Sequence, residues 1–192
     1  MERCRLVFSG SGGQGLITAA IILAEAAVIQ EGLNAIQSQT YGAAARGGVT
    51  RSDVIISDSE INFPKVTQPN ILVCLTQEAY TSYYSIIRPG GLLITDSFLV
   101  HSQHKADARK FNLPLYKSVQ ERIGKTIVLN ICMLGALQAL TEIVKPDSLL
   151  NVIRQRVPER FFEMNQNALY LGMELAREQM GSEAPAPYTT AS

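Results

Sequence analysis

Short apolar runs alternate with longer apolar stretches along the first half of the chain. The short runs are rich in β-branched residues and predict strands at residues 5–9, 34–40, 49–57, 71–75 and 92–95. The longer stretches predict helices at residues 16–30 and 78–87. Because strands that alternate with helices are typical of a sheet covered on both faces, we predict an α/β fold, a three-layer α/β/α sandwich.

Two further segments complete the predicted sheet. The turn Asp58–Ser59–Glu60 favours a hairpin from the 49–57 strand into Ile61–Phe63, which makes the sheet mixed but still largely parallel. A polar stretch at 101–110 predicts a surface loop or short helix, and Leu113–Tyr116 is expected to add an edge strand after it.

The C-terminal part of the chain has a helical pattern. Pro146 and Pro158 are expected at helix starts, where the missing N–H and the fixed φ of proline are tolerated best. The predicted helices are 127–144, 147–156 and 159–180. Residues 181–192 are rich in Ala, Pro, Ser and Thr, which is typical of disorder. We therefore expect one domain at residues 1–180 and a disordered tail at 181–192.

Two of the predicted helices, 16–30 and 127–144, are apolar on every side. A helix of this kind is buried on every side. Either both are central helices of one domain, or an outer face is covered by another chain. Glu25 interrupts the first of them and is expected to form a buried ion pair or to lie at an interface.

The composition favours cover by another chain. Charged residues make up 18% of the 192 residues, below the roughly 25% usual in globular domains, while hydrophobic residues reach 46%. Lys and Arg total 17, as do Asp and Glu, so the formal net charge is zero. This balance argues against nucleic-acid binding and against a polybasic membrane anchor, because both need a clustered basic excess.

The cysteines and histidines argue against a metal centre. Cys4, Cys74 and Cys132 are far apart and form no Cys-x-x-Cys motif, so we predict reduced thiols and no zinc or iron–sulfur site. His101 and His104 lie in a polar stretch without a third ligand, and a solvated loop is expected there. The sequence has no signal peptide pattern and no stretch long enough to span a bilayer, so we expect a cytoplasmic protein.

A glycine-rich segment, Gly10 to Gly15, separates the first strand from the first helix with the spacing G-x-G-x-x-G. Glycines let the backbone approach a ligand closely, and a helix N-terminus offers free N–H groups to a phosphate. The dinucleotide fingerprint also needs a carboxylate roughly 20 residues further on, but Gln37–Thr40 contains none, so NAD binding is disfavoured. Two interpretations of this loop remain: a tight turn that binds no ligand, and a binding loop for the phosphate of a nucleotide-bearing ligand. We favour the binding loop.

A second glycine-rich loop, Tyr41–Gly48, joins two predicted strands. Arg46 precedes Gly47 and Gly48, so a planar, always-charged donor lies on a backbone that can approach a ligand or a partner. Arg51 is expected to add a second positive group nearby. The alternative interpretation is a flexible connection with a solvated Arg46.

Several short blocks accompany the two loops in a fixed order. The loops contain GSGGQG at 10–15, QTYG at 39–42 and ARGG at 45–48. The further blocks are Ser57–Asp58, Phe63–Val66, Leu72–Leu75, Glu78–Tyr80, Pro89–Gly91, Asn130, Leu134–Ala136 and Asn165. Across residues 4–175 the sequence resembles the gamma subunit of 2-oxoacid:ferredoxin oxidoreductases (the pyruvate/ketoisovalerate oxidoreductase gamma family), and within it the 2-oxoglutarate branch. Ala43–Ala44 departs from relatives, which often have Pro and Glu there.

The resemblance implies one subunit of a larger enzyme. Such enzymes convert a 2-oxoacid, coenzyme A and oxidised ferredoxin into acyl-CoA, carbon dioxide and reduced ferredoxin. Thiamine diphosphate lies between their alpha and beta subunits, and the iron–sulfur clusters sit on the beta or delta subunit. The resemblance thus implies alpha, beta and in some cases delta partners, and a gamma chain with no catalytic residue that is inactive alone.

Coenzyme A is the ligand that we expect the two loops to contact, through its phosphates. The loops are alternatively expected to contact the neighbouring subunit. The candidate cofactor-binding residues are Gly10, Gly12, Gly13, Gln14, Gly15, Tyr41, Arg46, Gly47 and Gly48. Two other identities stay open at this point: a subunit of the related indolepyruvate-specific enzyme, and a stand-alone nucleotide-binding module.

Overall fold

A six-stranded sheet forms the centre of the computed structural model, which describes residues 3–40, 49–102 and 107–181. The strand order is β2-β3-β1-β4-β5-β6. The strands are β1 (Cys4–Ser11), β2 (Asn34–Thr40), β3 (Val49–Ser57), β4 (Ile71–Cys74), β5 (Gly91–Asp96) and β6 (Ala108–Leu113). The predicted α/β sandwich with a mixed sheet is confirmed, and of the expected tail at 181–192 all but Gly181 lies outside the described residues.

The sheet is mixed for a reason that differs from the predicted one. Strands β1, β4, β5 and β6 are parallel, whereas β3 runs antiparallel to both of its neighbours, β1 and β2. The predicted hairpin strand Ile61–Phe63 is wrong, because this segment has no strand conformation. Both edges of β3 are already paired, so a hairpin partner would find no free row of backbone groups.

The predicted edge strand Leu113–Tyr116 is also wrong. The edge strand is β6, which ends at Leu113, and Pro114 then leads into a helix, α3 (Leu115–Arg122). Most of β6 faces solvent and includes Arg109 and Lys110. An edge strand needs no continuous apolar run, so the pattern expected of buried strands is missing there.

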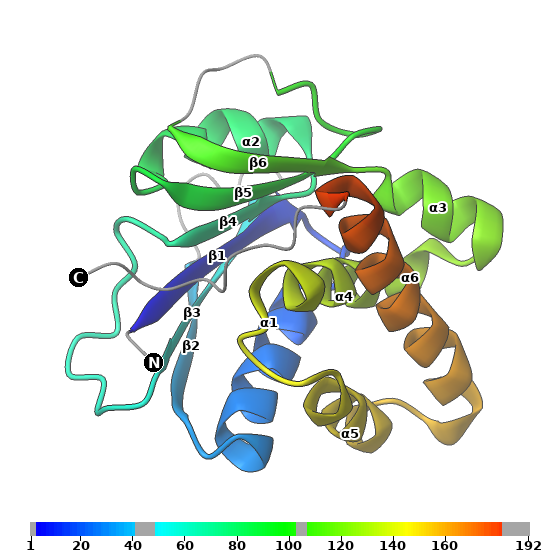
Figure 1. The fold of residues 1–192 in the computed structure, drawn as a ribbon, viewed down its shortest axis with the longest axis horizontal. Helices are drawn as coiled ribbons and strands as arrows, with labels where there is room; N and C mark the ends of the chain where they lie inside the picture. Colours follow the sequence, from blue (N-terminus) through cyan, green and yellow to red (C-terminus); the bar gives the residue numbers. More distant parts are fainter. Residues whose placement is uncertain (1–2, 41–48, 103–106, 182–192) are drawn as a thin grey trace.

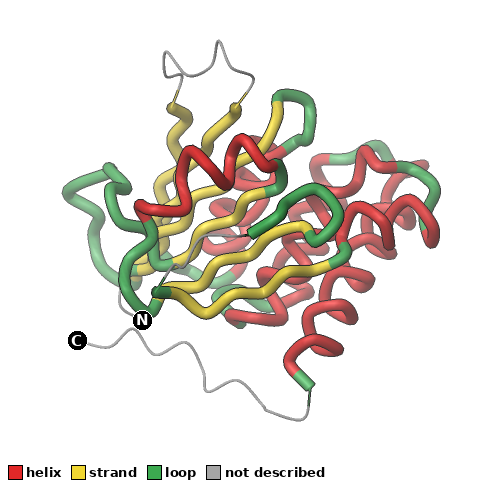
Figure 2. Tube along the Cα trace, turned by 90° about the horizontal axis from the view of Figure 1, so that it is seen from above, coloured by secondary structure: helices red, strands yellow, loops and turns green. Residues whose placement is uncertain are grey.

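Helices cover the two faces of the sheet unequally (Figures 1 and 2). Helix α2 (Gln77–Tyr83), extended by the 3₁₀ turn η3 (Tyr84–Ile86), lies on one face. The other face carries α1 (Leu16–Glu25) with its π-helical continuation η1 (Ala26–Gln30), α4 (Leu129–Thr141), α5 (Pro146–Arg156) and α6 (Phe162–Met180). The 3₁₀ turns η4 (Thr126–Val128) and η5 (Glu159–Phe161) precede α4 and α6. No helix among the described residues is both long and apolar enough to cross a membrane.

Two hydrophobic cores follow from this arrangement. Along β1, Leu6 and Phe8 face the larger core with α1 and α4, whereas Val7 faces the smaller core with α2. Side chains alternate between the faces of a strand, so a strand covered on both sides must be apolar at every position. This explains why β4 and β5 were recognisable as continuous apolar runs.

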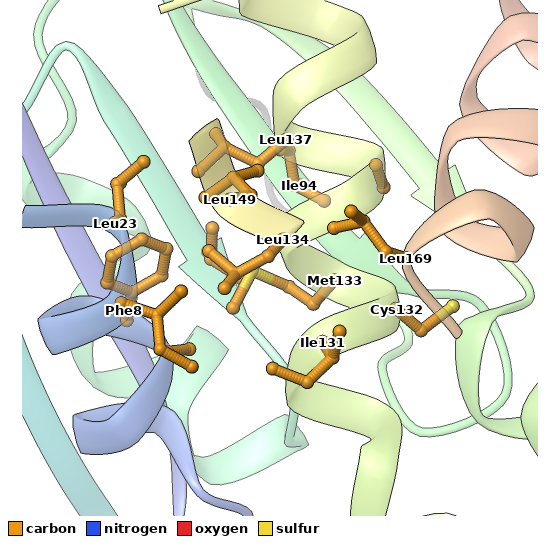
Figure 3. Close-up of a cluster of buried hydrophobic side chains, with 14 of the residues drawn as sticks. Phe8, Leu23, Ile94, Ile131, Cys132, Met133, Leu134, Leu137, Leu149 and Leu169 are labelled. Atoms are coloured by element: carbon orange, nitrogen blue, oxygen red, sulfur yellow. The ribbon is translucent and has the colours of Figure 1, made fainter. Parts of the chain in front are cut away.

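Helix α4 is the centre of the larger core, and all 13 of its residues are buried. Figure 3 shows Ile131, Met133 and Leu134 between the sheet and the surrounding helices. The interpretation as a central helix is therefore confirmed for this segment. The first helical segment is different, because Val28 and Ile29 at its end are 45% and 60% exposed.

The expected ion pair of Glu25 is also present, and it is half-buried rather than buried. The Arg156 guanidinium on α5 binds both carboxylate oxygens of Glu25. This pair holds down the pKa of Glu25 and joins the end of α1 to α5. This ion pair explains why an otherwise apolar helix contains a carboxylate at Glu25, and no contact with a second chain is needed for it.

Two glycines bring α4 and α6 into backbone contact. A Cβ at Gly135 would overlap the carbonyl oxygen of Leu169, and a Cβ at Gly172 would overlap that of Cys132. Each glycine thus lies against the backbone of the opposite helix. The two helices can approach this closely only where both lack a side chain.

We expect Gly135→Ala to destabilise the protein by about 1–3 kcal/mol or more, because the added methyl group meets a backbone oxygen that cannot rotate away. In an ordinary helix the same change stabilises by up to about 1 kcal/mol, so the sign of the effect tests the contact. Urea unfolding measures it, with Glu178→Ala on the exposed side of α6 as the control. An unchanged or raised unfolding midpoint for Gly135→Ala would contradict the prediction.

Candidate functional site

The glycine loop, Gly10 to Gly15, turns the chain from β1 into α1 as predicted. Gly13 and Gly15 have φ of +87° and +70°, in the left-handed region that side chains rarely adopt. Gly15 is also the residue that caps α1. The glycines at these two positions are therefore required by the path of the backbone.

Gln14 closes the inside of this loop. Its Oε1 accepts a hydrogen bond from the backbone N–H of Ser11 at 2.8 Å. A Cβ at Gly10 would overlap the same oxygen, so Gly10 makes room for the glutamine side chain. Gly10 and Gln14, both candidate binding residues, thus shape the loop.

The opposite side of the glycine loop is not covered by any part of the chain that the structure describes. Gly12 and Gly13 are exposed, no described atom lies within 4 Å of a Cβ placed on Gly13, and the nearest described atom to one on Gly12 is Thr50 Oγ1 at 3.9 Å. Helix α1 begins beside them without a side-chain cap and without an acidic residue in its first turn. Such a helix start has free N–H groups and a partial positive charge, which fits an anionic group such as a phosphate.

The second loop lies outside the described residues, and so do Tyr41, Arg46, Gly47 and Gly48. The strand ends that flank it are described. Strand β3 begins at Val49, which pairs with Ser11 at the end of β1, while β2 ends at Thr40 opposite Arg51. Residues 41–48 are therefore bounded by strand ends at the same edge of the sheet as the glycine loop.

Arg51 does not add the expected second positive group, because an ion pair compensates its charge. Its Nε and Nη2 bind the two carboxylate oxygens of Asp53 at 2.7 and 2.9 Å. Nη2 also donates to the carbonyl oxygen of Val66, and the guanidinium lies 5.3 Å from the ring centre of Tyr83. Arg51 is thus neutralised on the α2 face and holds the segment after β3 against the sheet.

Asn130 joins the site from a distant part of the chain. Its Nδ2 donates to the carbonyl oxygen of Gly15 at 3.1 Å, across a separation of 115 residues. The sequence pattern marked Asn130 only as one block of the resemblance. A contact of this range has no local signal, so the pattern could not place it beside the loop.

The sequence pattern of the family described as pyruvate ferredoxin/flavodoxin oxidoreductase matches residues 5–175. The chain belongs to this family. The 2-oxoglutarate synthase subunit KorC of Methanocaldococcus jannaschii is 43% identical over 92% of this chain and 95% of its own length. The pyruvate synthase subunit PorC of Methanothermobacter thermautotrophicus is 28% identical over 87% of this chain and 92% of its own.

Solved structures of the family have the same fold. The gamma subunit of a keto/oxoacid ferredoxin oxidoreductase from Geobacter sulfurreducens has a TM-score of 0.83 and 41% identity, with 90% of this chain and 98% of that chain covered. The 2-oxoglutarate:ferredoxin oxidoreductase of Magnetococcus marinus has a TM-score of 0.85 at 20% identity, and the match covers 98% of this chain and 33% of that chain. The family fold thus occurs both as a separate subunit and within a longer chain.

The cysteines of this family member do not suit an iron–sulfur cluster. Cys4, Cys74 and Cys132 are free, buried and on separate elements, β1, β4 and α4. Among the described residues no group of three His, Cys, Asp or Glu could hold a metal ion. His101 is exposed, and His104 lies outside the described residues. The prediction that Cys74 and Cys132 are core thiols is confirmed.

Burial raises the pKa of each of the three thiols from 9.0 to about 12. About a thousandfold less thiolate than in an unfolded chain is then present near neutral pH. We therefore expect the native protein to resist alkylation by iodoacetamide at about pH 8, where the urea-unfolded protein reacts at all three cysteines. Mass spectrometry over time measures this, and equal rates in the two states would contradict it.

A surface groove of about 550 Å³ lies between α3 and α6, away from the glycine loop. Arg122 lines it, but its guanidinium already binds both carboxylate oxygens of Glu174 at 2.8 and 2.9 Å. None of the lining residues belongs to the glycine loop. The groove is therefore separate from the glycine loop, and one of its two arginines is already paired with a carboxylate.

Proposed function

We propose that this chain is the gamma subunit of a 2-oxoglutarate:ferredoxin oxidoreductase. The gap in identity within the family supports this branch. Relatives named 2-oxoglutarate synthase subunit KorC are 36–43% identical, whereas those named pyruvate synthase subunit PorC are 28–29% identical. A solved structure with this fold is described with 2-oxoglutarate, coenzyme A and succinyl-CoA bound.

In the proposed reaction the bond between the 2-oxo carbon and the carboxylate of 2-oxoglutarate breaks, and carbon dioxide leaves. The two electrons left on the acyl carbon reduce two equivalents of ferredoxin, one electron each. The acyl group forms a thioester with the sulfur of coenzyme A, and the thiol proton is released to solvent. Thiamine diphosphate on partner subunits would supply the carbanion-stabilising chemistry, and iron–sulfur clusters on those subunits would supply the path for the electrons.

This chain is proposed to hold the phosphates of coenzyme A. No described side chain covers the backbone at Gly12 and Gly13, and the start of α1 offers N–H groups beside them. Arg46, which belongs to the second loop, is expected to pair with a phosphate of coenzyme A. Binding at this point leaves the reactive thiol end of the long ligand free to reach the partner subunits.

Asp96, the most buried of the described carboxyl groups, has a structural role. Asp96 is fully buried at the end of β5, and burial raises the pKa of its carboxyl group. Its oxygens accept backbone N–H groups of Phe98, Leu99 and Tyr116 at 2.6–2.9 Å. Asp96 thus holds the turn after β5 to the start of α3, and we assign the chemistry to the partner subunits.

Purification of the tagged chain from cells that also make its partners tests the subunit assignment. We expect partner chains that contain thiamine diphosphate and show iron–sulfur absorbance, and an assembled enzyme that prefers 2-oxoglutarate to pyruvate and indolepyruvate. A preference for indolepyruvate would support the related enzyme instead. A stable monomer that binds only a nucleotide would overturn the assignment.

Gly13→Val tests the coenzyme site in the assembled enzyme. The valine side chain would cover the exposed side of the loop and block the approach of a phosphate. We therefore expect the KM for coenzyme A to rise about tenfold to a hundredfold, which corresponds to the loss of one or two charge-assisted hydrogen bonds. The KM for 2-oxoglutarate should stay unchanged.

Gly32→Val is the matched control for this experiment. Gly32 also has a positive φ, +68°, and no described atom within 4 Å of its Cβ position. It lies before the first residue of β2, at the end of the strands opposite to the glycine loop. Both variants carry similar backbone strain, so only Gly13→Val should affect coenzyme A. An equal effect of the two variants, or none, would argue against the proposed site.

A further inference from the structure

We propose that Asn130 is a positioning residue for coenzyme A: it holds the glycine loop in the orientation that receives the phosphates. This inference rests on the proposed function. Asn130 is the second residue of α4 and only 6% exposed, so its side chain contacts the loop from the protein side. It is not expected to touch the coenzyme.

The contact between Asn130 and Gly15 is closely fitted. The carbonyl oxygen of Gly15 accepts the Nδ2–H of Asn130 at 3.1 Å and the backbone N–H of Ala19 at 3.0 Å. A Cβ on Gly15 would lie 2.7 Å from Nδ2 of Asn130. The amide group therefore occupies the space that a side chain on Gly15 would need, and it leaves room only for glycine.

This hydrogen bond fixes the direction of an N–H group at the start of α1. In a trans peptide the C=O and the following N–H point in opposite directions. Asn130 and Ala19 hold the carbonyl of Gly15 on the protein side, so the N–H of Leu16 points away from the helix. Rotation of this peptide plane would turn that donor away from an incoming anion.

Asn130 is anchored more firmly than the loop that it holds. Every residue of α4 is buried, and the backbone contacts at Gly135 and Gly172 fix α4 against α6. Beyond the strand pairing of Gly10 and Ser11, the loop is closed by two local hydrogen bonds between Ser11 and Gln14, and α1 has no side-chain cap. The hydrogen bond from Asn130 therefore restrains Gly15 against a helix that is fixed in the core.

Asn165 on α6 provides a matched control. It is 7% exposed, and its Nδ2 donates to the carbonyl oxygen of Phe161 at 2.8 Å. Removing either amide deletes one buried hydrogen bond to a backbone carbonyl. The two changes should lower stability to a similar extent, and only the one at Asn130 should affect the glycine loop.

The experiment compares Asn130→Ala, the isosteric Asn130→Asp and Asn165→Ala in the complete enzyme. Calorimetry gives the Kd for coenzyme A, steady-state kinetics gives the KM values for coenzyme A and 2-oxoglutarate, and thermal unfolding gives stability. We expect Asn130→Ala to raise the Kd about tenfold without changing the KM for 2-oxoglutarate. Asn130→Asp should weaken binding further, because it replaces the donor by a negative charge, and Asn165→Ala should leave both values unchanged.

Equal effects of Asn130→Ala and Asn165→Ala on coenzyme A would overturn the inference, because Asn130 would then be merely structural. An unchanged Kd for Asn130→Ala, where Gly13→Val weakens binding, would overturn it and leave the proposed function standing. An unchanged Kd in both would overturn the coenzyme site as well. If Asn130→Ala does not assemble, Asn130→Asp, which keeps the shape of the side chain, decides between the same outcomes.

Discussion

The backbone contact between α4 and α6 is the constraint on which the rest of the structure depends. Gly135 and Gly172 let the two helices approach until each lies against a carbonyl of the other. This proximity completes the burial of α4 between the sheet and its neighbouring helices (Figure 3). Because α4 is fixed, its first turn is a firm base for the glycine loop, and a surface feature of the fold is tied to its most buried element.

The reversed strand β3 is the second feature that defines the site. It lies between β1 and β2 and antiparallel to both, so its first residue, Val49, is paired with Ser11 at the start of the glycine loop. In a purely parallel sheet the segment before β3 would enter from the opposite edge. The reversal therefore brings the ends of two loop segments, distant in sequence, to one edge.

The sequence predicted the elements better than their connections. Strands β2 and β3 and the glycine turn are specified by local patterns, since apolar runs and positive-φ positions depend on neighbouring residues. The exposed edge strand β6 was missed because Arg109 and Lys110 break the apolar pattern. Asn130 could not be placed beside Gly15, and the ion pair of Arg51 was not foreseen, because the contacts of both depend on how the chain folds back on itself.

The ion pair of Arg51 and Asp53 has a consequence for the electric field at the sheet edge. Arg51 pairs with Ser9 and Asp53 pairs with Val7, so the two residues lie about 7 Å and about 14 Å along the strand from Ser11 of the glycine loop. An unpaired carboxylate at Asp53 would repel an approaching phosphate through the low-dielectric interior. The ion pair with Arg51 removes this repulsion, so the carboxylate of Asp53 does not oppose the positive end of the α1 dipole.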